Sequence, residues 1–141
     1  MAIRYGGADS NEALGLRMTV EAPDGTTSTN PVKVGEIFKL GGTDADGGGY
    51  KLVAAADNDT PDSVVMVQAS ERMTVVGPMT VRVLGRYSQI QTLPYLAAEV
   101  PSVGGSIQIS ATVRKVGAAT FAAGSYVLNV DTATEEVEVL V

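Results

Sequence analysis

The feature that most constrains the fold is the alternation of short apolar segments with tight turn signals between Val34 and Arg86. Segments such as VGEIFKL and MTVRVL are followed directly by glycine. No apolar period of three to four residues, which would indicate an amphipathic helix, runs through this region. The pattern therefore predicts short β-strands joined by turns.

The same pattern extends over most of the chain, and nine or so strands with spaced turns predict an all-β fold, a small sandwich or barrel with Gly-rich turns. Gly41–Gly49 is expected to be an exposed loop tip. Within Tyr87–Pro101, a short helix over YLAAEV and an extended connection both remain open. The expected strands lie within Leu14–Ala22, Val32–Leu40, Tyr50–Ala56, Ser63–Ala69, Met73–Val76, Met79–Arg86, Gly104–Ser110, Ala111–Val116, Gly124–Val130 and Glu135–Val141.

Three of these strands carry predictions about burial, because side chains of a strand alternate between its two faces. In the last strand, the three valines of EEVEVLV are expected on one face, and Glu136 and Glu138 on the other. In Val32–Leu40, one face is expected to carry Val34, Phe38 and Leu40, and the other Ile37. The continuous apolar run SVVMV predicts burial on both faces or at an interface.

The length of 141 residues fits one domain, or one domain with an extended arm. We expect an N-terminal arm over residues 1–13 and a β domain over 14–141, with a possible second small β lobe within about 87–141. The arm is expected to contact a partner through Ala2, Ile3, Arg4 and Tyr5, although a frayed terminus is an open alternative. Ile3 and Tyr5 share a face if the arm is extended.

Charge and composition restrict the partners and the compartment. The net charge of −6 disfavours binding to nucleic acid, because phosphate backbones repel an acidic surface. No basic cluster, signal-like opening or apolar run of membrane-spanning length is visible, so no membrane partner is expected. The absence of cysteine fits synthesis in a reducing cytoplasm.

Catalytic chemistry is poorly represented, so we do not expect an enzyme. The chain has no histidine and no cysteine, which removes the commonest general base and the thiol nucleophile. Ser–Lys chemistry and carboxylate pairs remain open, the pairs being Asp44/Asp46, Asp57/Asp59 and Glu135/Glu136. All three pairs fall in expected turns, where solvated acidic residues are ordinary.

No metal or other cofactor is predicted. Asp44-Ala45-Asp46-Gly47 resembles the start of a calcium loop, but the twelfth position is Ala55 instead of glutamate. Gathering of Asp57, Asp59 and Asp62 around a hard cation is a weaker possibility. The glycine-rich segment GGTDADGGG lacks the Gly-Lys-Ser/Thr ending of a phosphate loop.

The order of elements in the middle of the chain resembles the head decoration, or cement, proteins of tailed bacteriophages. The resemblance covers roughly residues 32–70, and the closing hairpin YVLNVDTATEEVEVLV is similar to the end of small capsid-associated phage proteins. The segments that carry it are Val34-Gly35-Glu36-Ile37, the glycine-rich tip, Lys51-Leu52-Val53-Ala54, the Ala56-Asp57 turn and Ser63–Val67.

The resemblance implies a mostly β protein, usually a homotrimer, that binds the major capsid protein on the exterior of the mature virion head and stabilises the shell. It also implies that an N-terminal arm, here Ala2–Tyr5, orders on the capsid. The chain departs from the family by its additional segment, about Tyr87–Val141. Three alternatives remain open: another virion component (tail tube, head completion or fibre-associated), a host-surface or glycan-binding module, and a small hydrolase.

Overall fold

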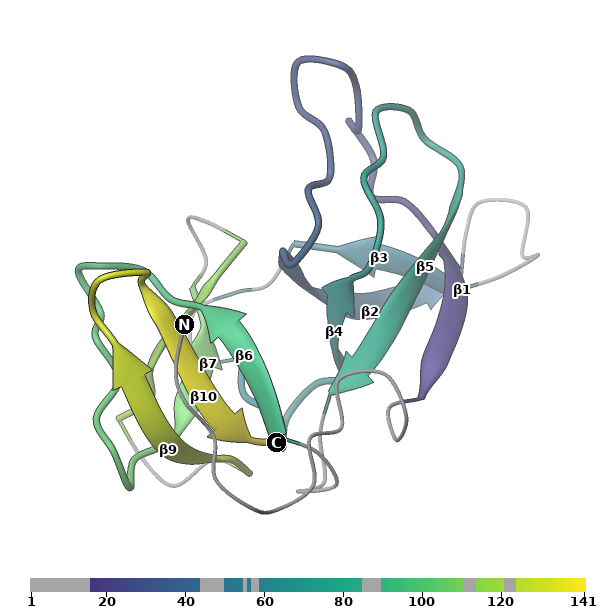
Figure 1. Ribbon diagram of the computed structural model, residues 1–141. Coiled ribbons are helices and arrows are strands. Elements are labelled where there is room, and N and C mark those ends of the chain that lie inside the picture. Colours follow the sequence, from purple (N-terminus) through teal and green to yellow (C-terminus); the bar gives the residue numbers. More distant parts are fainter. Residues whose placement is uncertain are drawn as a thin grey trace.

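The computed structural model describes residues 16–43, 50–54, 56, 59–84, 90–110, 114–120 and 124–141. Within these ranges the regular structure consists of ten strands, and no helix occurs (Figure 1). The predicted all-β fold is therefore confirmed. The strands are β1 (Arg17–Glu21), β2 (Ile37–Thr43), β3 (Tyr50–Val53), β4 (Met66–Ala69), β5 (Pro78–Leu84), β6 (Ile90–Pro94), β7 (Ile107–Ile109), β8 (Val116–Ala118), β9 (Tyr126–Asp131) and β10 (Glu136–Leu140).

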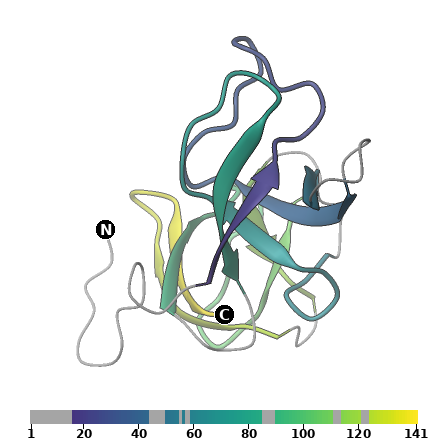
Figure 2. The ribbon, with the colours of Figure 1, turned by 90° about the vertical axis from the view of Figure 1, so that its right-hand side faces the viewer.

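The first five strands form a closed barrel in the order β1-β3-β2-β4-β5. Strand β1 closes it by pairing antiparallel with β5 and parallel with β3, while the other pairs are antiparallel. Figure 2 shows the barrel strands crossing one another at steep angles beneath two long loops. A closed sheet has no open edge, so the barrel does not offer a strand edge for pairing with another chain.

The remaining strands form two small sheets beside the barrel (Figure 1). One is three-stranded, in the order β6-β10-β9, and is antiparallel throughout. The other is the antiparallel pair β7-β8. We name these five strands and their connections, residues 90–141, the C-terminal half, and residues 16–84 the barrel half.

Two buried clusters divide the apolar side chains, and strand alternation decides which cluster each side chain joins. In β2, Phe38 packs with the barrel cluster while Ile37 packs with the other, as their opposite faces predicted. In β4, Val67 joins the barrel cluster and Met66 the other, and both side chains are fully buried. The prediction of burial on both faces is thus confirmed for these two residues.

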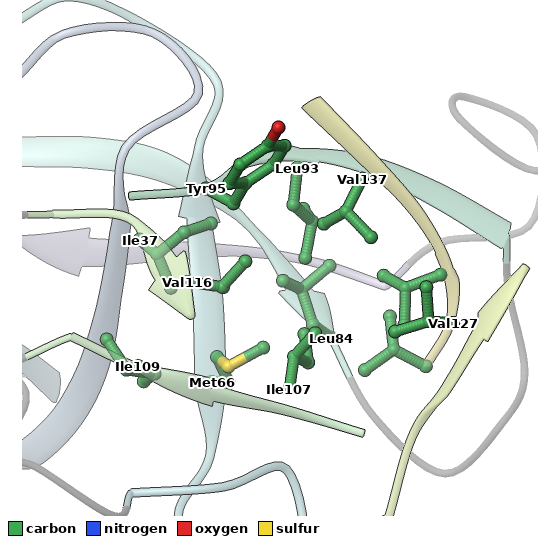
Figure 3. Close-up of a cluster of buried hydrophobic side chains, with 12 residues drawn as sticks. Ile37, Met66, Leu84, Leu93, Tyr95, Ile107, Ile109, Val116, Val127 and Val137 are labelled. Atoms are coloured by element: carbon green, nitrogen blue, oxygen red, sulfur yellow. The ribbon is translucent and has the colours of Figure 1, made fainter. Parts of the chain in front are cut away.

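The cluster shared between the halves contains side chains from eight strands (Figure 3). The barrel contributes three of them, Ile37, Met66 and Leu84, and the C-terminal half contributes the rest. The hydrophobic core of the C-terminal half is therefore incomplete without the barrel. The division into an arm, a β domain and a second lobe stays a prediction.

Polar contacts also join the halves. The Nη1 atom of Arg114 donates to the carbonyl oxygen of Pro31 at 2.8 Å and to the Glu36 carboxylate at 3.2 Å. Its guanidinium lies 4.9 Å from the centre of the Phe38 ring, and its carbonyl accepts the amide of Ile37. These contacts place one C-terminal side chain against the loop, the turn and the core of the barrel half.

The final hairpin has the predicted orientation. Val137, Val139 and Val141 are all fully buried in the shared cluster. Glu138 lies on the other face but is only 4% exposed, which the alternation pattern did not predict. A register shift between Glu138 and Val139 marks a β-bulge in this pair of strands.

Several local predictions were wrong. Val34 is exposed in a turn and does not share the buried face of Phe38, because Gly35, with φ of +90°, turns the chain just before β2. Strand β2 extends through Gly41 to Thr43, into the expected loop tip. Met73–Val76, predicted as a strand, has only an isolated bridge at Met73. Of the two alternatives left open for residues 95–100, the structure excludes the short helix.

Candidate interaction surface

The predicted arm residues Ala2, Ile3, Arg4 and Tyr5 lie outside the described residues, so their capsid contact stays a prediction. Asp44, Asp46 and Asp57 also lie outside the described residues, so the carboxylate pairs that include them stay untested. The acidic candidates that the structure places are Asp59, Asp62, Glu135 and Glu136.

Asp59 is a structural junction between the two halves. Its Oδ2 atom accepts 2.7 Å hydrogen bonds from Lys39 Nζ and from the amide of Ala56, and its carbonyl accepts the amide of Ile109 in β7. Burial raises the pKa of the Asp59 carboxyl, but the hydrogen bonds from Lys39 and Ala56 outweigh it, and the net pKa is lowered. The expectation of a merely solvated turn residue was therefore wrong for Asp59.

The geometry does not favour a cation at this turn. The Asp59 carboxylate already pairs with the Lys39 ammonium, and both side chains are mostly buried. Asp62 instead lies over the backbone of Gly124, where an added Cβ would meet its carboxylate. Among the described residues, no group of three or more acidic side chains is close enough to hold a metal ion.

The best-placed serines and lysines also have structural partners. Buried Ser106 donates to the carbonyl of Ser125, and the Ser125 hydroxyl accepts the amide of Ile107. Lys51 donates to the Asp24 carboxylate at 2.6 Å, as Lys39 does to Asp59. None of these hydrogen bonds joins a serine to a lysine, so they do not build the Ser–Lys pair that the sequence left open.

A two-loop protrusion is the most prominent surface feature. It consists of residues 22–36, between β1 and β2, and residues 70–77, between β4 and β5. Both ribbon views show the two loops rising together from one end of the barrel (Figures 1 and 2). We use the name protrusion for these two segments.

The two loops of the protrusion are fixed to each other by backbone hydrogen bonds. Val32 and Met73 exchange both of theirs, at 2.8 and 3.0 Å, and Ala22 donates to the Gly77 carbonyl at 2.8 Å. Val32 is fully buried and Met73 packs beside it, so the barrel cluster extends into the protrusion. The loops therefore form one packed unit.

The tip of the first loop is a tight turn. Thr27 and Asn30 pair through two backbone hydrogen bonds of 3.2 Å, and the Asn30 side chain donates to the Gly25 carbonyl. Thr26 is buried and donates through its hydroxyl to the carbonyl of Pro23. Such side-chain bonds to backbone carbonyls satisfy polar groups that a loop would otherwise leave to water.

The protrusion ends in uncharged residues. The segments GTTSTNPV (25–32) and MTVVGPM (73–79) contain no charged side chain, although the chain as a whole is 18% charged. Val75 and Val76 are 62% and 50% exposed. The ends of the two loops thus present apolar and hydroxyl groups, whereas the rest of the protrusion carries the charged residues Asp24, Lys33, Glu36, Glu71 and Arg72.

The fold is similar to a solved phage structure, the crystal structure of the head fiber gp8.5 N base of bacteriophage phi29. The two chains superpose with a TM-score of 0.59 over 91% of this chain and 94% of the phi29 chain, at 13% sequence identity. The likeness shows that the two proteins share a fold over nearly their whole lengths. No family model matches the chain, and no curated protein matches it in sequence.

Sequence reasoning missed the protrusion because its two loops were treated separately, and Met73–Val76 in the second loop was predicted to be a strand. Two signals were available: residues 25–32 and 73–77 are uncharged, and a Val-Val pair directly precedes the Gly77-Pro78 break. Their pairing depends on barrel closure, which brings the β1–β2 and β4–β5 connections to the same end.

In the described part of the chain, no helix is long and apolar enough to cross a membrane.

Proposed function

We propose that this chain is a structural component of a tailed-phage virion, displayed on the exterior of the mature head, where it binds the major capsid protein. The observation that carries the proposal is the fold shared with the phi29 head fiber base over more than nine tenths of both chains. The sequence resemblance to head decoration proteins points to the same location on the virion.

Physical considerations support a binding role. A phage shell repeats the same surface many times, so a small protein that bridges neighbouring subunits gains affinity through several simultaneous contacts. Binding that prefers the expanded shell stabilises that shell by linkage. In this proposal the chain acts as a homotrimer, which supplies three equivalent contacts.

A second candidate function follows from the phi29 protein itself, which is described as the base of a head fiber. In that case the chain is the capsid-proximal base of a longer appendage. The two functions require different properties of the protein. A reinforcing protein must bridge capsid subunits and raise the resistance of the shell to heat, whereas a fibre base needs only to attach.

The deciding experiment adds purified protein to mature heads that lack it. We expect saturable occupancy on the head surface, seen by sedimentation and electron cryomicroscopy, and weaker binding to unexpanded proheads. A higher temperature of DNA release on occupied heads supports reinforcement, and an unchanged temperature with full occupancy supports a fibre base. Absence from heads, or density on tails, refutes the proposal.

The arm needs its own test. Deleting Met1–Gly7 is expected to leave the unfolding transition unchanged and to reduce occupancy on heads, because strand addition and side chains such as Ile3 and Tyr5 contribute to attachment. A double substitution, Ile3→Ser with Tyr5→Ser, keeps the backbone and isolates the side-chain contribution. Equal occupancy by full-length and truncated protein would exclude a role for the arm.

A further inference from the structure

We infer that the Asn129 side chain protects the outer edge of β9 and so prevents a second copy of this chain from adding a strand to the sheet β6-β10-β9. This role applies to the free chain in solution and does not depend on the proposed function. Strand β9 is the outer strand of its sheet and lies on the side away from the barrel (Figure 1). An outer strand offers backbone groups that can pair with another chain unless something covers them.

The sequence of β9 is well suited to unwanted pairing. Residues 126–130 read YVLNV, an uncharged segment without proline that consists mainly of residues favouring strands. Tyr126 and Leu128 are 49% and 39% exposed. Exposed segments of this composition are the ones that associate through their backbone. Asparagine is disfavoured within strands, so Asn129 is the residue of β9 whose presence needs a structural reason.

The first part of the β9 edge is covered by the chain itself. The amide of Val127 donates to the Gly105 carbonyl, and the Val127 carbonyl accepts the Gly104 amide, both at 2.9 Å. Gly105 can lie there because it has no side chain, since an added Cβ would be 3.0 Å from the Ser102 carbonyl oxygen. The backbone groups of Val127 therefore point away from β10 and are already paired.

The second part of the edge is covered by Asn129. Val127 and Asn129 pair with consecutive residues of β10, so Leu128 is the additional residue of the bulge. Because successive strand residues turn their amides to opposite sides and the bulge adds one residue, the amide of Val130 again points to the outer edge. The Asn129 Oδ1 atom accepts this amide at 3.0 Å. An incoming strand would need the same amide as a donor.

Other strands of the C-terminal half are covered by neighbouring backbone. In β7, the amide of Ile109 donates to the Asp59 carbonyl at 2.8 Å. In β8, the Val116 carbonyl accepts the amide of Leu96 at 2.9 Å. Covered strand edges thus recur in this half of the molecule, and Asn129 differs because a single side chain provides the cover. One substitution should therefore be enough to open the edge of β9.

The test compares variants of the full chain with the wild type. Asn129→Val removes the acceptor and favours a strand, whereas Asn129→Asp keeps an acceptor oxygen next to Val130 and adds a charge. Thr19→Val is the matched control, because it also introduces an exposed valine into a strand, but in β1 of the closed barrel. Asn129 and Thr19 are both exposed, so all variants are expected to unfold at about the wild-type temperature.

Sedimentation velocity over a range of concentrations measures self-association, and hydrogen exchange in dilute protein measures the Val130 amide. We expect Asn129→Val to associate at concentrations about tenfold or more below those of the wild type, because the opened edge gains backbone hydrogen bonds. Its Val130 amide should exchange faster in dilute protein, because the acceptor is gone. Asn129→Asp and Thr19→Val should sediment like the wild type. Asn129→Ala also lacks the acceptor and repeats the test if Asn129→Val does not fold.

Three results would overturn the inference. The first is wild-type sedimentation of the folded variants that lack the acceptor. The second is equal association of Thr19→Val, which would assign the effect to added apolar surface. The third is association of Asn129→Val with unchanged exchange of the Val130 amide, which would show that the hydrogen bond from this amide provides no protection. Head binding enters none of these results, so they stand apart from the test of the proposed function.

Discussion

The two halves of the molecule build their cores in different ways. The barrel half surrounds its cluster with a closed sheet, and each strand contributes alternate side chains to it. The C-terminal half has two small sheets and many connections, and its core includes three side chains that belong to barrel strands. The barrel can thus order its interior from its own strands, whereas the C-terminal half depends on the barrel to complete its core.

Substitutions at the neighbouring residues Met66 and Val67 test the difference between the two cores most strongly, because the two side chains pack in different clusters. Met66→Ala should lower the free energy of unfolding by about 3 kcal/mol, and Val67→Ala by about 2 kcal/mol. Met66→Ala should speed amide exchange mainly in β7 and β10, and Val67→Ala mainly in β1 and β5. Hydrogen-exchange mass spectrometry distinguishes these patterns. Identical exchange patterns for the two variants would mean that the clusters behave as one core.

Substitutions at Arg114 test how much the contacts between the two halves contribute to the free energy of unfolding. Arg114→Ala removes donors to Pro31 and Glu36 and the contact with the Phe38 ring. We expect a loss of about 2 kcal/mol, because two partly buried acceptors lose a charged donor. Arg114→Lys should recover only part of the loss, since lysine lacks the planar guanidinium. Urea unfolding measures both, and full recovery by lysine would show that charge alone matters.

The lowered pKa of Asp59 predicts how acid changes the stability of the contact between the two halves. Its folded pKa is lowered, below the unfolded value of about 3.9, so the unfolded chain binds the proton more readily. The stability from Asp59 is therefore present above about pH 4 and lost as the pH falls through the folded pKa. Asp59→Asn should cost about 1 kcal/mol at pH 7 and much less at pH 3. Urea unfolding at both pH values checks this, and an equal cost at both would contradict the ion-pair account.

The smallest expected effect on stability comes from turn residues with positive φ, which differ between the two halves. In the barrel half, the described positive-φ positions are Gly25 and Gly35, whereas the β9–β10 turn uses Glu135 with φ of 55°. Glu135→Gly should raise the free energy of unfolding by about 0.5 kcal/mol, because a side chain is strained in that region. Thr132→Gly, in the same turn, should lower it by a similar amount. Thermal unfolding compares the two, and a loss for both would exclude strain at Glu135.

Local information was sufficient for most strands and for many of their faces, but it did not predict β6, and it wrongly predicted a strand over Met73–Val76. Alternation placed Ile37 and Phe38 on opposite faces and the valines of β10 on one face. It failed at Val34, where a turn glycine ends the extended run. It also could not show that Asp59 anchors two halves, because the partners of Asp59 are set by tertiary packing.

An all-β protein could be predicted from the residues alone, because a two-residue period interrupted by turn residues is incompatible with long helices. Three features became visible only in the folded molecule: five strands close into a barrel, two separate loops pair into a protrusion, and Ile37, Met66 and Leu84 complete the core of the C-terminal half. The physical reason is that face alternation is a property of each strand alone. Partner choice depends on hydrogen bonds and burial between segments far apart in the chain.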